Sequence, residues 1–193
     1  MKPPILLAGL IFALVPAAAA EAAPYIGLDL GEASIDFNNS ASTLYSQSVA
    51  GFEFHVGERF EGFAAELGYG TMNKNGNTTI DNMRLDKLTA DAIYYLPVFG
   101  RISLLLTAGV DEVSYGASTY STTQYQSNGI YKTSRDDMSV LSGNGFDWRA
   151  GAGFSFPIFD DFELHFVGRY EPLKMGGQAN YTLSTEVGID YYF

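Results

Sequence analysis

The sequence of 193 residues contains no cysteine and few charged residues, and basic residues are especially scarce. Without cysteine, the chain has neither a disulfide framework nor a thiol that a lipid anchor could modify. Acidic residues outnumber Lys and Arg by 22 to 11, which gives a formal net charge of −11. A nucleic-acid-binding surface needs a basic footprint. This composition therefore excludes nucleic acid as a partner.

Long apolar runs are also missing, apart from one near the amino terminus. A short basic start precedes an apolar segment over residues 5–15, and small residues follow. This order predicts a signal peptide over residues 1–22, cleaved after Ala20 or Ala22, rather than a buried helix. The apolar segment is shorter than the roughly 20 residues of a transmembrane helix. We therefore expect an exported protein whose mature domain comprises residues 23–193.

Apolar and polar residues alternate in the last stretch of the chain. Odd positions from Leu183 to Phe193 are apolar apart from Thr185, whereas Glu186 and Asp190 lie at even positions. Because successive side chains of a strand point to opposite faces, this segment has one apolar and one polar face. Seven earlier segments alternate in the same way. They cover residues 25–31, 50–57, 63–70, 88–96, 102–111, 147–156 and 163–170.

Eight such segments fit either a soluble sandwich or a membrane barrel. Most are close to the roughly 9 to 11 residues that a tilted strand needs to cross a bilayer. Their polar faces carry charges and glycines, which suit a polar lumen better than the interior of a sandwich. Short and long connections alternate along the chain. The short ones are residues 57–62, 97–101 and 157–161, and the long ones are residues 36–47, 72–84, 112–145 and 171–178. Because short periplasmic turns and long extracellular loops mark outer-membrane barrels, we predict an all-β fold, an eight-stranded antiparallel transmembrane up-and-down β-barrel.

Aromatic residues gather at the ends of the predicted strands. Near the short connections lie Phe60, Phe63, Tyr94, Phe99, Phe156, Phe159, Phe162 and Phe193, and near the long ones lie Tyr69, Trp148 and Tyr170. Membrane barrels place such rings at both interfaces between lipid and water. We therefore expect two aromatic girdles, which the core of a soluble protein would not require.

The mature chain resembles the small OmpA/OmpX-type family of bacterial outer-membrane β-barrels with opacity-protein-like loops. The alternation, the segments AELGYG, LTAGVD and RAGAGFSF, and the ending VGIDYYF carry this resemblance. It implies a location in the outer membrane of a Gram-negative bacterium and an assembly signal formed by Tyr191 and Phe193. The expected partners are the barrel assembly machinery, outer-membrane lipids, lipopolysaccharide and a host or other cell-surface ligand. We expect the barrel to be a monomer.

The sequence offers little for catalysis or metal binding. It holds 2 histidines, His55 and His165, both on predicted lumen faces near short connections. A lipid-modifying barrel needs its base and nucleophile where an acyl chain can reach them, and no Gly-x-Ser-x-Gly motif is present. Isolated histidines at polar positions are usually satisfied by hydrogen bonds instead of a metal. We predict no catalytic residue, no metal site and no cofactor.

Charged residues of the predicted lumen fall at similar depths on neighbouring strands. Arg149, Arg169 and Glu186 share one level, and Glu53, Glu66 and Asp91 lie somewhat lower on the opposite wall. A guanidinium group can donate to several carboxylates at once. We predict an ion-paired layer with Arg169 at its centre, bonded to Glu186 and within reach of Glu66 or Glu53. Such a layer would plug the barrel; the alternative is a wet channel with separately hydrated charges.

The longest predicted loop has the composition of a recognition surface. Residues 114–134 are almost all Tyr, Ser, Thr, Gly, Gln or Asn, and the tyrosines are Tyr115, Tyr120, Tyr125 and Tyr131. Adaptable binding loops use the same residue types. These tyrosines are therefore the candidate surface-binding residues, although a solvated loop that only mixes with lipopolysaccharide sugars would have the same composition.

The dipeptide Asn128-Gly129 predicts a two-residue hairpin turn at the tip of this loop. The two flanking strands should therefore continue beyond the membrane as a hairpin. A two-residue tip pairs odd with even positions, whereas the lipid faces of both strands lie on even positions. One extra residue must be absorbed, and we expect a β-bulge within residues 142–145.

These features predict a structural or surface-interaction role, similar to that of an adhesin, through the extracellular loops. A small diffusion pore is the alternative, based on the Gly-rich and charged lumen, and a hydrolase of outer-membrane lipids is a third possibility. Side chains just fill the interior of an eight-stranded barrel, which favours the first role.

Overall fold

The computed structural model describes residues 22–36, 47–75, 82–127, 130–175 and 178–193. The predicted signal peptide lies outside these residues except for Ala22. The side chains of residues 117–141 and 173–180, and those of the strand-end residues Asp36, Gln47, Asn75 and Asn82, also lie outside the description. The described strands are β1 (Ala23–Asp36), β2 (Gln47–Phe60), β3 (Phe63–Asn75), β4 (Asn82–Phe99), β5 (Ile102–Ser127), β6 (Ile130–Phe159), β7 (Phe162–Met175) and β8 (Gln178–Tyr192).

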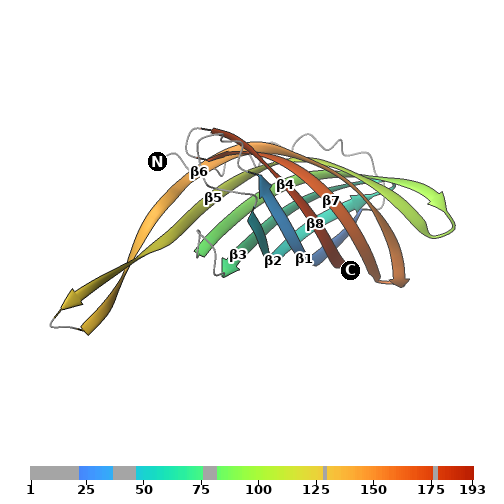
Figure 1. Cartoon of the computed structure of the whole chain (residues 1–193). Coiled ribbons are helices and arrows are strands. Elements are labelled where there is room, and N and C mark those ends of the chain that lie inside the picture. The colour runs from blue at the N-terminus through green and yellow to red at the C-terminus, as the bar shows by residue number, and fades with distance from the viewer. Residues whose placement is uncertain (1–21, 37–46, 76–81, 128–129, 176–177) are drawn as a thin grey trace.

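The strands pair in chain order into a closed antiparallel barrel, and β8 pairs back onto β1 (Figure 1). The predicted eight-stranded up-and-down barrel is confirmed. None of the described segments forms a helix that is long and apolar enough to cross a membrane. Two-residue turns join β2 to β3, β4 to β5 and β6 to β7. We call this side of the barrel the short-turn end.

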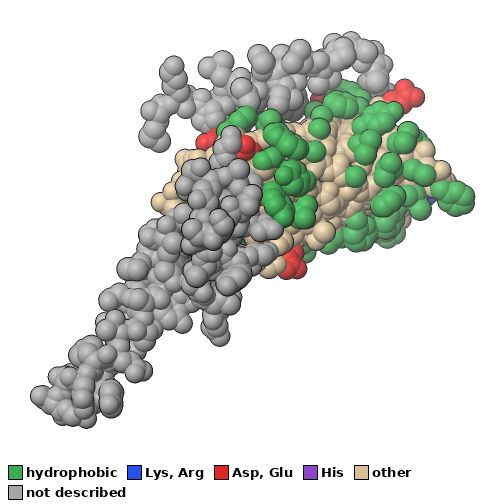
Figure 2. Space-filling model, turned by 45° about the horizontal axis from the view of Figure 1, so that its top comes forward, with side chains coloured by type: hydrophobic (Ala, Val, Ile, Leu, Met, Phe, Trp, Pro, Cys, Tyr) green, Lys and Arg blue, Asp and Glu red, His purple; other side chains and the backbone are tan. Residues whose placement is uncertain are grey.

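The outer wall carries the apolar face of every strand, as the alternation predicts. Leu30 is 58% exposed, Phe54 is 47% exposed and Leu88 is 50% exposed. Figure 2 shows apolar side chains gathered across this wall. A surface of this kind is unfavourable in water and is the lipid-facing band of a membrane barrel.

Aromatic rings lie at both edges of the band. Trp148 and Tyr170 have ring centroids 5.7 Å apart at the upper edge, which faces the β5–β6 hairpin. At the short-turn end, the rings of Phe162 and Tyr191 are 5.0 Å apart. Their positions match the two predicted girdles.

Above the band the strands continue further than predicted, so most of the described residues in the predicted long connections 72–84 and 171–178 belong to strands. Over residues 112–145 the continuing strands form the predicted hairpin. The polarity of the two faces inverts there. Glu32 and Arg84 lie on the outer face, while the inner face holds the buried upper cluster, which consists of Ala33, Ile35, Val49, Met72, Met83, Leu85, Val113 and Tyr115. The predicted strands ended early because they were defined by apolar residues facing outward, a pattern that ends with the membrane.

Strands β5 and β6 form the longest hairpin, which projects beyond the other strands in Figure 1. Their ladder reaches the pair Ser127 and Ile130. Asn128 and Gly129, the predicted tip, lie outside the described residues but fall between this pair. A two-residue connection is therefore consistent with the described ladder.

The predicted β-bulge is present, but its position differs from the prediction. Ser118 pairs with Ser139 and Ala117 pairs with Leu141, so Val140 is the extra residue. The bulge does not fall within residues 142–145. Gly143 is instead paired regularly with Tyr115, and a Cβ at Gly143 would meet the Tyr115 ring. This glycine makes room for an aromatic ring rather than for a bulge.

Candidate functional site

Arg149 lies at the centre of a buried ion-pair network in the barrel. Its Nε lies 2.9 Å from each carboxylate oxygen of Asp91, and its Nη2 lies 3.0 Å from Glu53 Oε1. The Nη2 atom also pairs with Asp91. Arg149 is 1% exposed, so these charges are compensated by one another instead of by water.

Arg169 forms the second centre of the network. Its Nε donates to Glu186 Oε2 at 2.7 Å, and its Nη1 lies 3.5 Å from Asp91 Oδ2. The predicted pair of Arg169 and Glu186 is thus present in the structure, whereas the central position belongs to Arg149. A Cβ at Gly109, the neighbour of Arg149 on β5, would meet the Asp91 carboxylate. The missing side chain lets Asp91 approach Arg149.

Glu66 lies apart from both arginines in the described hydrogen-bond pattern. It accepts a hydrogen bond from Tyr25 Oη at 3.0 Å, and its Oε2 lies 3.7 Å from His55 Nε2. The prediction that Arg169 would reach Glu66 or Glu53 therefore differs from the observed pairing. In the structure Glu53 binds Arg149.

A third ion pair joins Lys87 on β4 to Glu171 on β7. The other oxygen, Glu171 Oε1, lies 3.8 Å from Arg149 Nη1, so this pair extends the network toward the hairpin end. Neither residue was predicted from the sequence, because Lys87 precedes the apolar alternation of its strand and Glu171 follows that of its own strand. The strand alternation would have placed both residues on the inner face only if the two predicted strands had been extended to include Lys87 and Glu171.

Two histidines and two aspartates form a cluster nearer the short-turn end. His165 Nε2 lies 2.6 Å from Asp29 Oδ1, and His165 Nδ1 lies 3.1 Å from Asp190 Oδ2. His55 Nε2 lies 2.7 Å from Asp190 Oδ1. Carboxylates facing both ring nitrogens favour a His165 that donates from both, that is, an imidazolium ion. Both histidines thus have carboxylate partners.

Glycines leave the space that this cluster fills. A Cβ at Gly27 would meet His55 and Asp190, and a Cβ at Gly188 would meet Asp29 and His165. The recurrence of glycine on the inner faces is therefore the sequence signal that could have located the bulky partners.

The carboxylates of Glu53, Glu66 and Asp91 have oxygens within 4.8 Å of one another, a spacing that could hold a metal ion. In the structure, the Arg149 guanidinium contacts two of these three acids. This arginine supplies the positive charge that a metal would otherwise provide.

Apolar clusters lie above and below the charged groups. The upper cluster covers the hairpin side. The lower cluster, toward the short-turn end, consists of Tyr25, Ala64, Ile93, Tyr95, Leu105 and Val167, with Tyr192 packed against it. The ion-pair network of Arg149, Arg169 and Lys87 is thus flanked by two apolar clusters.

The four loop tyrosines do not share one environment. Tyr115 is only 9% exposed and belongs to the upper cluster, which corrects its assignment to a surface-binding loop. The inversion of polarity above the membrane turns its ring inward. Tyr120, Tyr125 and Tyr131 lie on the hairpin beyond the bulge, and their side chains are outside the described set.

The predicted assembly residues lie on the outer wall at the short-turn end. Tyr191 packs against Phe162 and Phe193, with ring centroids 5.0 Å and 5.3 Å away. The Phe193 backbone N–H donates to Pro24 O at 3.1 Å. Recognition of these rings during assembly stays a prediction.

An exposed ion pair lies above the band on β4. Arg84 Nε donates to Asp86 Oδ2 at 2.8 Å, and this hydrogen bond lowers the pKa of the Asp86 carboxyl below its ordinary value. The pair is water-accessible, unlike the pairs in the lumen.

Comparisons with known proteins point to one kind of barrel. A family model described as the outer membrane protein beta-barrel domain matches residues 5–193, while no curated protein matches the chain. Among solved structures, the chain is similar to Neisserial surface protein A, with a TM-score of 0.66 and 16% identity over 88% of this chain and 97% of that chain.

Two further solved structures show the same architecture. Ail of Yersinia pestis, in complex with the heparin analogue sucrose octasulfate, has a TM-score of 0.52 and 13% identity over 90% of this chain and 99% of that chain. The outer membrane protein AlkL, solved in lipid bilayers, has a TM-score of 0.55 and 13% identity over 92% of each chain. At these identities the similarity concerns the fold alone.

Proposed function

The chain belongs to the outer membrane protein β-barrel family, and from this premise we propose that it is a closed scaffold that presents the β5–β6 hairpin to a ligand at the cell surface. The hairpin itself carries this proposal. Its ladder runs without a break in pairing from the membrane to Ser127 and Ile130, apart from the single bulge at Val140. A paired projection of this length suits contact beyond the lipopolysaccharide layer better than a short turn would.

The packed interior supports a scaffold over a diffusion pore. Arg149, Arg169 and Lys87 are each at most 3% exposed and all have carboxylate partners. Apolar clusters flank them on both sides. A solute could pass only by displacing these groups. This agrees with the general rule that side chains fill the interior of an eight-stranded barrel.

The composition of the hairpin indicates the chemistry of its ligand. Between residues 118 and 139 the charged residues are Lys132, Arg135, Asp136 and Asp137, so the positive and negative charges cancel. The sulfated ligand in the Ail structure is strongly anionic, and this hairpin lacks the basic excess that such a ligand needs. Tyrosine and hydroxyl side chains favour an uncharged polar ligand that accepts hydrogen bonds and packs against rings.

Shortening the hairpin tests this proposal. In the trimmed variant, residues 118–140 are replaced by an Asn-Gly turn between the paired residues Ala117 and Leu141. A second variant keeps the length and carries Tyr120→Ser, Tyr125→Ser and Tyr131→Ser. Each is produced in the outer membrane of a non-adherent bacterium, and attachment to host cells is counted.

Both variants should retain a heat-modifiable barrel and lose attachment. A control that replaces residues 76–81 with a Gly/Ser segment of equal length should attach like the wild type. If the trimmed variant attaches at the wild-type level, the hairpin is not the binding element and the proposal is refuted.

A further inference from the structure

The short-turn end of the barrel holds a cavity that takes no part in the ion-pair network or in the proposed surface contact. Its volume is about 430 Å³, within the range of pockets that bind small molecules. In outer-membrane barrels the short turns face the periplasm. The cavity therefore opens where the inner, phospholipid leaflet meets water.

One arginine of the cavity is held in place by its neighbours. Arg59 Nη1 donates to Glu163 Oε2 at 2.6 Å and to Tyr192 Oη at 3.1 Å. Its guanidinium carbon also lies 3.9 Å from the centroid of the Tyr95 ring. These contacts make Arg59 part of the wall.

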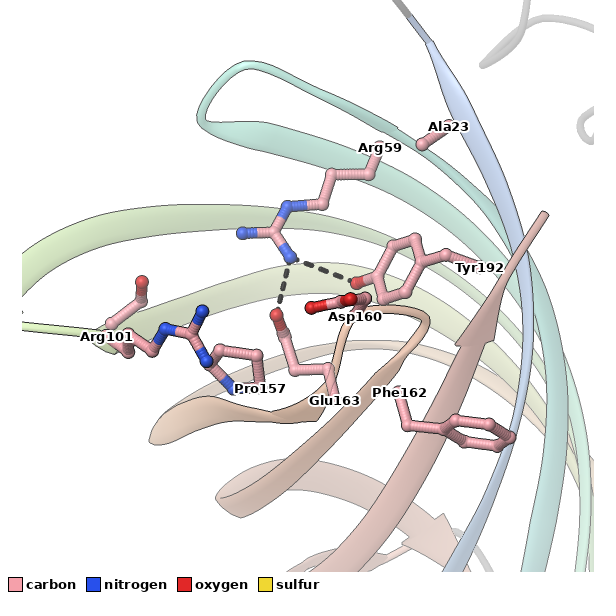
Figure 3. A pocket seen from close by; sticks show the side chains of 9 residues that line it. Ala23, Arg59, Arg101, Pro157, Asp160, Phe162, Glu163 and Tyr192 are labelled. Carbon is pink, nitrogen blue, oxygen red and sulfur yellow. Dashed lines mark hydrogen bonds and ion pairs between the residues drawn. The ribbon is translucent and has the colours of Figure 1, made fainter.

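The second arginine and one carboxylate oxygen of the cavity lining have no hydrogen-bond partner among the described residues. Arg101, on the β4–β5 turn, is exposed and forms no hydrogen bond or ion pair with any other residue that the structure describes. Glu163 is 6% exposed, and its Oε1 has no hydrogen-bond partner within the described part of the chain. Figure 3 shows Arg59 and Arg101 reaching into the cavity from two sides, with Glu163 below Arg59 and Asp160 beside Tyr192. A cation and an anionic acceptor thus both line the cavity.

An apolar groove begins beside this cavity on the outer wall. It has a volume of about 290 Å³, and its apolar lining includes Ile26, Leu28, Phe54, Phe162, Ile189 and Tyr191. Phe162 lines both hollows. The groove extends from this shared residue along β1 and β8 into the lipid-facing band. The charged cavity at the barrel mouth and the apolar groove on the outer wall therefore meet at the rim residue Phe162.

We propose that this pair of hollows binds a phospholipid whose headgroup carries a phosphate and a primary ammonium group. The phosphate binds Arg101, and the ammonium donates to Glu163 Oε1 and to Asp160. One acyl chain crosses Phe162 and lies in the groove against Leu28 and Ile189. Charge complementarity selects the headgroup, and the apolar groove that begins at the shared residue Phe162 selects an occupant with a long apolar tail.

Lipid binding to the purified, delipidated barrel in detergent tests the proposal. Phosphatidylethanolamine, phosphatidylcholine and phosphatidylglycerol with identical acyl chains are titrated, and bound lipid is counted by native mass spectrometry. Phosphatidylethanolamine should bind tightest, because choline lacks N–H donors and glycerol lacks the cation. Arg101→Gln should weaken its binding about tenfold, as expected for a charged hydrogen bond, while Arg84→Gln on the far side should have no effect.

Two further arms separate the headgroup from the tail. Asp160→Asn should reduce the preference for phosphatidylethanolamine over phosphatidylglycerol. Leu28→Trp, which fills the groove, should weaken the binding of all three lipids. Soluble glycerophosphoethanolamine, which has no acyl chain, should not displace the bound lipid. Any one of three results would overturn the proposal. These are equal binding of the three lipids to the wild type, wild-type affinity of Arg101→Gln for phosphatidylethanolamine, and displacement of the bound lipid by the soluble headgroup.

Discussion

Replacing Arg149 with methionine removes the group on which the interior charges depend. Methionine keeps much of the volume and lacks the guanidinium group, so Asp91 and Glu53 lose their principal partner. Both acids are at most 3% exposed. Arg169 forms a described ion pair with Asp91, its Nη1 lying 3.5 Å from Asp91 Oδ2, but none with Glu53.

The expected loss of stability follows from this arrangement. Removing one partner of a buried ion pair typically costs about 3 to 5 kcal/mol, because a charge stays behind without water or counter-ion. Arg149→Met should therefore lower the free energy of unfolding by about 3 to 5 kcal/mol. The triple variant Arg149→Met, Asp91→Asn, Glu53→Gln carries no uncompensated charge at these positions and should recover part of the loss.

Urea unfolding in lipid vesicles measures the effect. The sequence has 1 tryptophan, Trp148, which is 52% exposed on the lipid-facing wall. Its fluorescence should change when the barrel leaves the membrane. Arg84→Met breaks the exposed pair with Asp86 and serves as the control, with little change expected. If Arg149→Met unfolds at the same urea concentration as this control, or if the triple variant is less stable than the single one, the reasoning is refuted.

Three other predictions concern the glycines, the bulge and the aromatic girdle. Gly188→Ala should lower the urea midpoint because its Cβ would enter the histidine cluster, whereas Gly116→Ala, whose Cβ would meet nothing within 4 Å, should not; equal midpoints would count against the role of glycine in the lumen. Deleting Val140 should give a regular β5–β6 ladder with continuous protection from hydrogen exchange, and loss of protection beyond the deletion would contradict the register. Phe193→Asp should reduce the heat-modifiable fraction in cells while Phe193→Tyr preserves it, and unchanged assembly of the charged variant would exclude the assembly role.

The sequence was sufficient for the fold within the membrane because the lipid imposes a simple rule there. Residues such as Leu30 and Leu88 face outward at every second position, and the resulting strands matched the structure. Above the membrane, water lies outside the barrel and the upper cluster lies inside. A rule that expects apolar residues to face outward therefore does not recognise Val113 and Tyr115 as strand residues that face inward. A search for strands whose polarity inverts at Glu32 would have extended them.

The lumen was predictable only in part. Alternation placed Arg149, Arg169 and Glu186 on the inner face, and the pair of Arg169 and Glu186 followed from neighbouring strands. The central role of Arg149 depends on contacts across the barrel, which depend on shear and on the room that Gly109 leaves. Sequence spacing along individual strands does not contain that information.

The closed interior is the central claim, and single-channel recording tests it most directly. Purified wild-type protein is inserted into a planar bilayer, and the current is measured at constant voltage in concentrated salt. The packed charges between two apolar clusters predict no steady conductance above the bare membrane. Uniform, long-lived conductance steps from the wild-type barrel would contradict the closed interior and establish a diffusion pore in its place.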